Sequence, residues 1–304
     1  MNVLITGSNG FIGKEFSRTK KFRFRHVVRS KGHQNLNQKN IFYVDGINRN
    51  TNWNGAFENI DVVVHLAGYT PNKKTTLSEY LEVNTDGTVH LAKEAIKANV
   101  KRFVFLSSIN VNGEETIGEG FSELETPQPK SPYAISKHKA EILLKDLKSD
   151  MEMVIVRPPL VYGKGVKGNL GMLLKIIKIL PILPFGAVRN KLSLISNSNL
   201  ADFLCLCVTD KKAANQTFVI ADSTQISTKQ LINDIGNSMN KKIIQLRLPP
   251  KLIKYFLNII GQRKVGNRLL NDLVINIDKA KSVFGWNKPA EVECSFRQLK
   301  NEEH

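Results

Sequence analysis

The sequence has 304 residues, 41% hydrophobic and 23% charged, and this composition excludes a disordered or fibrous chain. Lysine and arginine outnumber aspartate and glutamate by 44 to 27, so the net charge of +17 attracts anions such as nucleotides, nucleic acids or acidic membranes. The three cysteines form no disulfide framework and the six histidines show no metal-ligand spacing. We therefore expect a cytoplasmic protein without a metal, and the strand-like opening MNVLITG predicts no export signal.

The first half of the chain alternates short β-branched runs with helical patterns, which is typical of parallel strands joined by crossover helices. Two segments, 77–98 and 133–147, have the apolar spacing of amphipathic helices. The sequence therefore predicts an α/β protein with a Rossmann-type doubly wound parallel sheet over residues 1–165. The expected strands are 3–6, 26–29, 41–44, 61–66, 102–107 and 153–157.

The second half has a looser pattern with Pro and Gly in many segments. It predicts a smaller mixed α/β substrate-binding lobe over 166–304, interleaved with the first domain through returning elements at about 190–222. Because open α/β sheets bind ligands at the carboxyl ends of their strands, we expect the lobe to supply substrate contacts there. The expected elements are helices near 170–180, 199–208, 228–239 and 250–260, and a strand at 217–220.

A membrane-spanning helix is not expected. The most apolar stretch, 170–188, is interrupted by two lysines and two prolines. Peripheral membrane contact by 170–188 or 249–260 remains an alternative, although the pattern favours burial of both as helices of the lobe.

A glycine motif follows the first strand directly. In VLITGSNGFIG, Gly7 permits a tight turn, Gly10 lets the backbone approach a pyrophosphate, and Gly13 allows close helix packing. The helix N-terminus then faces the phosphate charge. The motif predicts dinucleotide binding, with a merely structural turn as the alternative. The predicted contacts are Gly7, Asn9, Gly10, Phe11, Ile12 and Gly13.

The end of the second strand bears on the choice of cofactor. An acidic residue there accepts a hydrogen bond from a free ribose 2′-hydroxyl, but this strand ends in Arg29, followed by Ser30 and Lys31. This favours NADP(H), while NAD(H) stays possible because a strand-end arginine can simply be solvated. At the end of the third strand, Asp45 is placed to accept from the adenine amino group. The small residues of HLAG predict close passage past the cofactor at Leu66, Ala67 and Gly68.

The segment YAISK carries the predicted catalytic chemistry. Tyr133 and Lys137 are four residues apart and therefore share one helix face, and a strand ending in FLSS precedes them. The ammonium, together with an oxidised nicotinamide, is expected to stabilise the phenolate of Tyr133, which passes a proton to or from a carbinol. Lys137 is also expected to hold the nicotinamide ribose, and Ser108 to orient the sugar oxygen.

The motifs TGSNGFIG, HLAG, NTDGT, FLSS with INVNG, SPYAISK and RPPLVYG resemble, in this order, the extended short-chain dehydrogenases/reductases that act on sugar nucleotides as epimerases, dehydratases and 4-keto reductases. The resemblance covers nearly the whole chain. It implies that the catalytic serine is Ser108 rather than Ser107, and that Asn84 of NTDGT contacts the cofactor. It also implies a homodimer built on 77–98 and 133–147.

The distal half is similar to bacterial UDP-hexose 4-epimerases and 4-keto-6-deoxyhexose reductases of polysaccharide synthesis. The resemblance implies a UDP-sugar substrate. Where relatives usually carry an arginine this chain has Leu192, so a diphosphate contact is expected to be lost or moved to Lys191 or Arg189. The substrate-binding residues implied are Ser108, Asn110, Tyr133, Arg157, Asn169 and Lys191.

The residues after the catalytic serine narrow the reaction. Dehydratases need an acid pair there, whereas Ser108 is followed by Ile109, Asn110 and Val111, so dehydration is disfavoured. Epimerisation and reduction at carbon 4 both remain, and Arg29 tilts the interpretation slightly toward reduction with NADPH. A non-catalytic NADP-binding regulator is the alternative from another class. Nucleic-acid binding is disfavoured because no recognition motif accompanies the charge.

Overall fold

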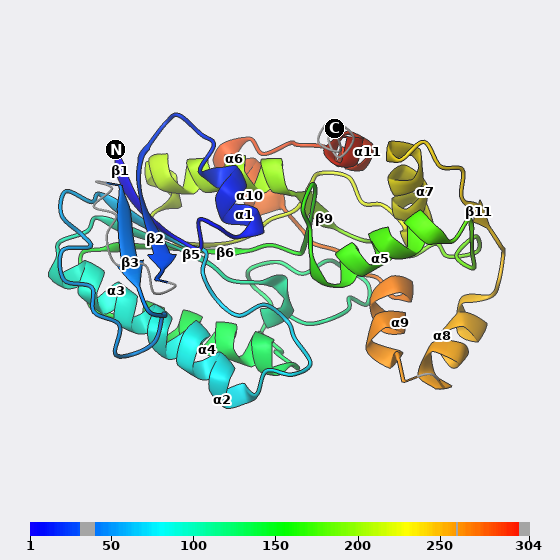
Figure 1. The fold of residues 1–304 in the computed structure, drawn as a ribbon, viewed down its shortest axis with the longest axis horizontal. Helices are drawn as coiled ribbons and strands as arrows, with labels where there is room; N and C mark the ends of the chain where they lie inside the picture. Colours follow the sequence, from blue (N-terminus) through cyan, green and yellow to red (C-terminus); the bar gives the residue numbers. More distant parts are fainter. Residues whose placement is uncertain (31–39, 260, 298–304) are drawn as a thin grey trace. The chain divides into compact units, whose positions relative to one another are not determined.

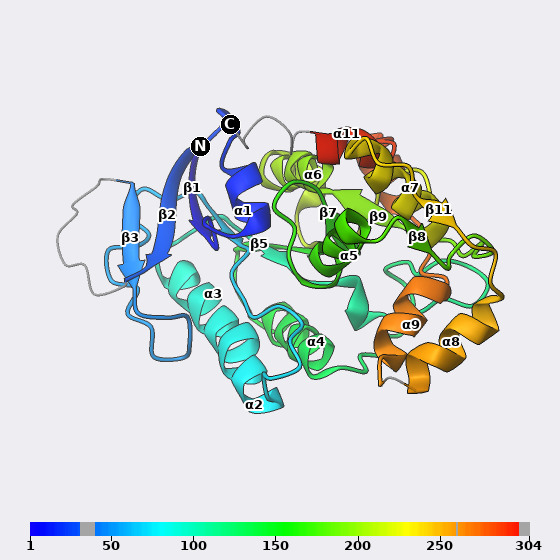
Figure 2. The ribbon, with the colours of Figure 1, turned by 45° about the vertical axis from the view of Figure 1, so that its right-hand side comes forward.

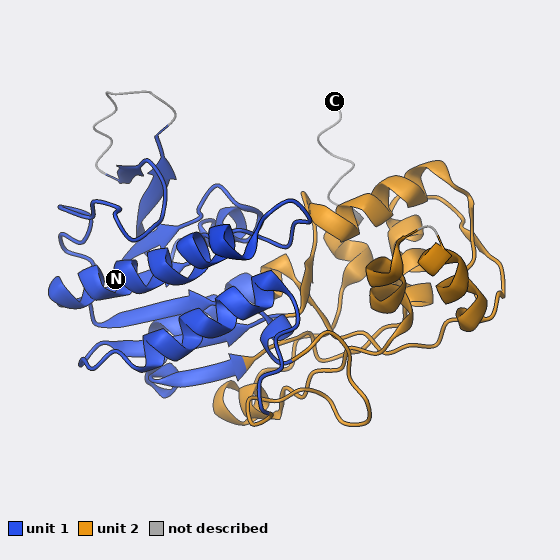
Figure 3. Cartoon of the chain, turned by 90° about the horizontal axis from the view of Figure 1, so that it is seen from below, with its two compact units in different colours: residues 1–112, 126–158, 200–218 blue, residues 113–125, 159–199, 219–304 orange. Residues whose placement is uncertain are grey.

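The computed structural model describes residues 1–30, 40–259 and 261–297 (Figure 1). The chain forms two compact units, coloured separately in Figure 3, and each is built from three segments. The first unit contains 1–112, 126–158 and 200–218, and the second contains 113–125, 159–199 and 219–304. The returning segment is thus 200–218. Segment 113–125 joins the second unit because the Thr116 and Phe121 amides donate to the carbonyls of Asp272 and Val274.

A seven-stranded sheet forms the centre of the first unit, in the order β10-β6-β5-β4-β1-β2-β3. From β6 to β3 the strands pair in parallel, as the crossover pattern predicted. The order reverses between β1 and β4, which is the position where doubly wound sheets bind ligands. The strands are β1 (Asn2–Thr6), β2 (Arg23–Arg29), β3 (Ile41–Val44), β4 (Val62–His65), β5 (Arg102–Leu106), β6 (Glu152–Arg157) and β10 (Gln216–Val219).

Helices cover both faces of this sheet: α3 (Thr88–Lys97) and α4 (Pro132–Lys145) lie on one face, α1 (Phe11–Phe16) and α6 (Asn197–Thr209) on the other (Figures 1 and 2). The small and apolar inner face of α3 and α4 packs on the strands and forms a core with Trp53 and Phe57. Ser131 caps the N-terminus of α4, because its hydroxyl accepts a hydrogen bond from the Ala134 amide. Pro132 suits the first position of the helix, where a backbone N–H would have no partner within the helix.

The predicted helix 77–98 is not one regular helix. It consists of α2 (Leu77–Tyr80), a π-helical turn η1 (Leu81–Gly87) and α3. In the π-helical turn the Thr85 hydroxyl donates to the Ser136 carbonyl of α4 at 2.8 Å, and Asn84 is fully buried. A π-helical turn inside a helix often marks a functional position.

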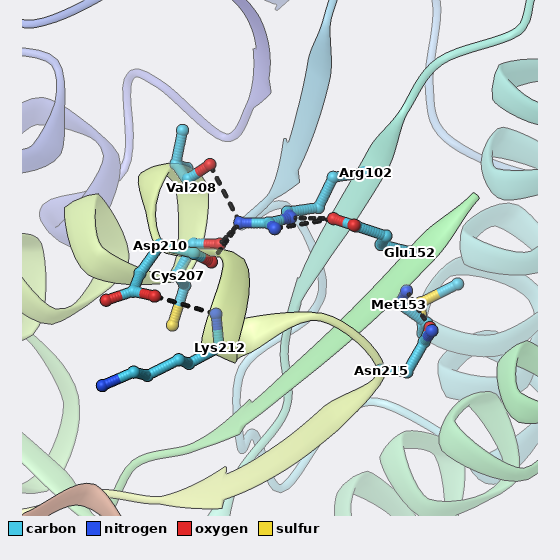
Figure 4. Close-up of polar contacts among 8 residues, drawn as sticks. All are labelled: Arg102, Glu152, Met153, Cys207, Val208, Asp210, Lys212 and Asn215. Atoms are coloured by element: carbon cyan, nitrogen blue, oxygen red, sulfur yellow. Dashed lines mark hydrogen bonds and ion pairs between the residues drawn. The ribbon is translucent and has the colours of Figure 1, made fainter. Parts of the chain in front are cut away.

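Arg102 attaches the returning segment to the sheet (Figure 4). The Arg102 guanidinium on β5 donates to the carbonyls of Cys207, Val208 and Asp210 at the end of α6, at 2.8, 3.0 and 2.9 Å. It also pairs with Glu152 on β6 at 2.6 Å. A cation is well placed there, because the last carbonyls of a helix lack partners within the helix.

The second unit has its own apolar core, to which helices and short strands contribute. Two parallel pairs, β7 with β9 and β8 with β11, contain only two or three residues per strand. Among the described helices, none is long and apolar enough to cross a membrane. The elements are β7 (Leu160–Tyr162), α5 (Gly168–Ile179), β8 (Ile182–Leu183), β9 (Leu194–Ser196), α7 (Thr228–Ser238), β11 (Ile244–Gln245), α8 (Pro250–Ile259), α9 (Arg263–Leu270), α10 (Asp278–Phe284) and α11 (Val292–Arg297).

Candidate active site

The glycine loop after β1 is tightly packed at two of its three glycines. Gly7 has a positive φ of 74°, and a Cβ there would lie 2.7 Å from the Ala67 nitrogen. A Cβ on Gly13 would lie 2.2 Å from the Gly7 oxygen, so only glycine allows α1 to start this close to the turn. At Gly10 a Cβ would meet only the Gly7 oxygen, at 3.0 Å.

The loop therefore fits a dinucleotide. Gly10 precedes the first turn of α1, where backbone amides attract phosphate oxygens, and its exposed surface leaves room for a phosphate. The buried hydroxyl of Ser8 has no hydrogen-bond partner among the described residues and so retains its capacity to bond a ligand. Asn9 is exposed beside it, while Phe11 and Ile12 are half-buried.

Two strand ends carry the predicted adenosine contacts. Arg29 is exposed at the end of β2, and Asp45 is exposed just after β3. The Ser30 hydroxyl donates to the Asp45 carboxylate at 2.7 Å, so these neighbouring strand ends share one polar surface. Lys31, also named from the sequence, lies outside the described residues.

The HLAG and NTDGT motifs meet at Asn84. Its side-chain oxygen accepts from the Tyr69 amide at 2.7 Å, and its amide nitrogen donates to the Tyr69 carbonyl and the Ser136 hydroxyl, both at 3.1 Å. A Cβ on Gly68 would lie 2.8 Å from the Asn84 oxygen and 3.5 Å from the Lys137 ammonium. Asn84 thus fixes the loop after β4 against the helix that carries Tyr133 and Lys137.

His65 of the same motif is a structural link rather than an acid or base. Its two ring nitrogens hydrogen-bond with Thr6 and Thr88, at 2.7 and 2.9 Å. Complete burial, and then the charge of Lys137, lower its pKa to about 3, so the ring is neutral at physiological pH.

Tyr133 lies beside Ser108 and Tyr80. Its phenol hydrogen-bonds with Ser108, which lowers the pKa of Tyr133, but burial outweighs this and raises the pKa to about 12. The ring of Tyr80 packs edge-on against that of Tyr133, with centroids 6.0 Å apart. Desolvation of the phenolate is therefore the largest effect on this pKa, and its stabilisation by Lys137 together with an oxidised nicotinamide stays a prediction.

Lys137 is buried one helical turn after Tyr133. Its ammonium donates to the Leu106 carbonyl at 2.9 Å and lies 4.6 Å from the centre of the Phe105 ring. Burial lowers the pKa of Lys137 to about 8, and the negative charge of Glu141 opposes this shift. The ammonium is thereby held at the carboxyl end of β5, beside Gly68.

The sequence matches the NAD dependent epimerase/dehydratase family over residues 3–221, which is more than two thirds of the chain. The chain belongs to this family. Among curated proteins it is 36% identical over 307 aligned positions to a UDP-glucose 4-epimerase of Vibrio cholerae, covering 98% of this chain and 94% of that protein. It is 26% identical to an N-acetyl-alpha-D-glucosaminyl-diphospho-ditrans,octacis-undecaprenol 4-epimerase of Escherichia coli O157:H7, over 82% of this chain and 75% of that one.

Solved structures with a fold similar to that of this chain include two complexes with NAD. MoeE5 in complex with UDP-glucuronic acid and NAD has a TM-score of 0.75 at 20% identity, covering 97% of this chain and 96% of that chain. A UDP-glucuronic acid 4-epimerase from Bacillus cereus, in complex with NAD, has a TM-score of 0.74 at 18% identity, covering 98% and 96%. The predicted Rossmann-type fold and the family resemblance are confirmed.

Arg157, which the resemblance implies as a substrate-binding residue, has protein partners in this structure. Arg157 is 3% exposed, and its guanidinium forms an ion pair with Glu141 at 2.5 Å, while a further nitrogen donates to the Asn112 side chain at 3.0 Å. Glu141 also accepts from the Ser107 hydroxyl. The donors of Arg157 are thus committed to a buried network with Glu141 of α4 and Asn112, and its contact with a substrate stays a prediction.

The same network separates the two serines of FLSS. Ser107 bonds Glu141 and is turned into the network, whereas Ser108 bonds Tyr133 and caps the short helix η2 (Ile109–Val111) by accepting from the Asn110 amide. Asn110 itself is half-buried. Of the pair, Ser108 is the serine that can share a substrate oxygen with Tyr133.

In the second unit, Asn169 is exposed in the first turn of α5, and Lys191 is exposed ahead of β9. Leu192 is buried in the core of that unit, and its backbone pairs with Ile226 in both directions. Leu192 is therefore a core residue, and Arg189 and Lys191 are the exposed cations beside it.

Sequence reasoning missed Tyr80 and Glu141. The signal for Glu141 was present, since it lies one helical turn after Lys137 on the helix face that carries Tyr133 and Lys137. Tyr80 gave no comparable signal, because a tyrosine inside an apolar pattern is usually a core residue.

Proposed function

We propose that this protein is an enzyme that oxidises and reduces carbon 4 of a UDP-hexose, with 4-epimerisation as its principal reaction. The observation that carries the proposal is the grouping of Ser108, Tyr133 and Lys137 at the carboxyl ends of the strands. The 36% identical UDP-glucose 4-epimerase, aligned with nearly the whole of both chains, supports the choice of reaction. It shifts the balance from the reduction that the sequence slightly favoured.

The side chains divide the proton chemistry among themselves. A nicotinamide cofactor, when bound, would supply the hydride acceptor and donor for carbon 4 of the sugar. The phenol oxygen of Tyr133 removes the proton of the carbon-4 hydroxyl in the first half and gives it back in the second. Ser108 donates to the same sugar oxygen and stabilises the charge that develops there.

Lys137 makes this chemistry possible at neutral pH. Because burial holds the pKa of Tyr133 at about 12, the phenolate needs positive charge beside it. The ammonium of Lys137 supplies one such charge, and it is positioned by the Leu106 carbonyl and the Phe105 ring. We propose that it also binds the nicotinamide ribose.

We further propose that the glycine loop, Leu66–Gly68 and Asn84 hold the cofactor, and that Asp45 binds the adenine. A second candidate function, reduction of a UDP-4-keto-6-deoxyhexose with NADPH, is favoured by one observation: Arg29 is exposed at the end of β2, where it suits a 2′-phosphate. We propose Asn110 as a sugar contact, and Asn169 and Lys191 as contacts of the UDP group.

The proposal includes a homodimer. On α2 and α4, Leu77, Ile135 and Ile142 are 40%, 36% and 46% exposed, and the last two share one face at a spacing of two helical turns. Exposed apolar residues on helices are suited to isologous helix packing between two copies.

The test is a product assay with both cofactors. Purified protein is incubated with UDP-glucose, UDP-galactose or their N-acetyl forms plus catalytic NAD, and with a UDP-4-keto-6-deoxyhexose plus NADPH, followed by NMR of the sugar. Interconversion of carbon-4 epimers without net cofactor consumption supports epimerisation. NADPH consumption with a single reduced product supports the second candidate. Tight cofactor binding with no turnover on any of these sugars contradicts both.

A further inference from the structure

Helix α8 has two apolar faces. One carries Ile253 and Leu257, which pack into the core of the second unit. The other carries residues spaced i, i+3, i+4 and i+7, which places them on one side of a helix. We call this second face the α8 outer face. It consists of Leu252, Tyr255, Phe256 and Ile259, which are 39%, 61%, 56% and 64% exposed.

The exposure of the α8 outer face is unusual for a surface helix. Single exposed apolar residues are common and do not indicate a binding surface, but a helix normally has polar residues on the side that faces water. A contiguous row of exposed apolar side chains indicates a surface that binds another protein or a membrane.

The charges around α8 select the partner. Residues 235–271 contain eight lysines and arginines and no aspartate or glutamate. Lys242 and Arg247 are exposed in the segment that leads into the helix, and Lys251 is exposed in its first turn. A second copy would bring the same positive charges to the same face, which opposes self-association through it. A nucleic acid would meet the charge but would not cover aliphatic side chains.

The short sheet of β8 and β11 in the same unit also carries exposed apolar residues close to lysines. Ile182 on β8 and Ile244 on β11 are paired in the sheet, and both are about half exposed, at 49% and 54%. Lys242 lies two residues before Ile244, and Lys178 precedes β8 at the end of α5. Apolar side chains interspersed with lysines thus recur in the second unit.

We propose that the α8 outer face docks on an anionic lipid bilayer. Its apolar side chains enter the boundary between headgroups and acyl chains, and the flanking cations bind acidic headgroups. This is an interfacial contact, which lies on the membrane without spanning it. The inference is independent of the proposed catalytic function.

The experiment is flotation of the full-length protein with vesicles. We expect the wild-type chain to float with vesicles of 70% phosphatidylcholine and 30% phosphatidylglycerol, to bind pure phosphatidylcholine at least roughly fivefold more weakly, and to lose binding in 0.5 M salt. Replacing Phe256 and Ile259 together by glutamate should weaken partitioning by roughly tenfold or more. Ile117→Glu and Leu124→Glu are matched controls, because these residues are 96% and 93% exposed elsewhere in the second unit.

A second variant keeps the proposal testable if the double substitution disturbs folding. Lys251→Gln leaves the apolar face intact and should weaken binding to phosphatidylglycerol vesicles by severalfold without lowering the melting temperature. The proposal is overturned if the wild-type chain stays with the unbound fraction, or if the control variants lose binding as much as the α8 variants. It is also overturned if light scattering shows that the α8 face instead joins two copies, with the glutamate variant monomeric.

Discussion

Replacing Glu141 by glutamine should destabilise the protein and also change its pH profile. Glu141 and Arg157 are 1% and 3% exposed and pair at 2.5 Å, and Glu141 also accepts from Ser107. The substitution leaves the Arg157 charge buried without its counter-ion, which costs about 3–5 kcal/mol. At roughly 2–4 °C per kcal/mol, the melting temperature should fall by about 6–20 °C.

The pH profile distinguishes an electrostatic role from a merely structural one. Glu141 raises the pKa of Lys137, which burial holds at about 8. Without Glu141 this pKa falls further, so Lys137 loses its proton at a lower pH. If the ammonium is needed for turnover, the alkaline limb of kcat/KM should move to lower pH.

The assay is calorimetry together with kcat/KM measured from pH 6 to 10. Glu152→Gln is the matched control, because Arg102 keeps three carbonyl acceptors when its partner is changed and Glu152 is partly exposed. The control should cost about 1 kcal/mol or less. An unchanged melting temperature and an unchanged alkaline limb in Glu141→Gln would refute the reasoning.

Three further predictions follow from individual side chains. Ser108→Ala should lower kcat/KM by about 100-fold. It should also raise the pKa of Tyr133 further, because the lost hydrogen bond favoured the phenolate. Ser107→Ala should lower kcat/KM far less, and equal losses in the two variants would argue against a role for Ser108. Cys294 is exposed, while Cys205 and Cys207 are buried and burial raises the pKa of both thiols. A disulfide reagent should therefore modify Cys294 quickly and the other two slowly, and equal rates at all three thiols would contradict this. Ile142→Glu should convert the proposed dimer to a monomer in light scattering, with Ile117→Glu as the control that leaves it unchanged.

The sheet could be predicted from the sequence because its strands are runs of buried β-branched residues with motifs at their ends. All six strands predicted in the first half occur, within a few residues of their expected bounds. The strands β7, β8, β9 and β11 gave no usable signal, since two or three residues establish no periodicity. The helices α9, α10 and α11 of the second unit were missed as well.

The site was predicted unevenly for a physical reason. Motif positions such as Gly7, Ser108 and Lys137 depend on local spacing, which a sequence displays directly. Partners across the fold are not displayed: nothing in RPPLVYG indicates that Arg157 pairs with a carboxylate on α4. Peripheral membrane contact by 249–260 was an alternative to burial, but the residues of the α8 outer face could not be predicted, because a sequence does not show whether an apolar residue faces the core or water.

The decisive measurement compares the wild-type chain with Tyr133→Phe, which removes one oxygen and retains the ring that packs against Tyr80. The account predicts unchanged cofactor affinity, an unchanged melting temperature and a turnover of UDP-hexose at carbon 4 that is about 1,000-fold slower. A variant that interconverts the carbon-4 epimers at the wild-type rate would contradict it.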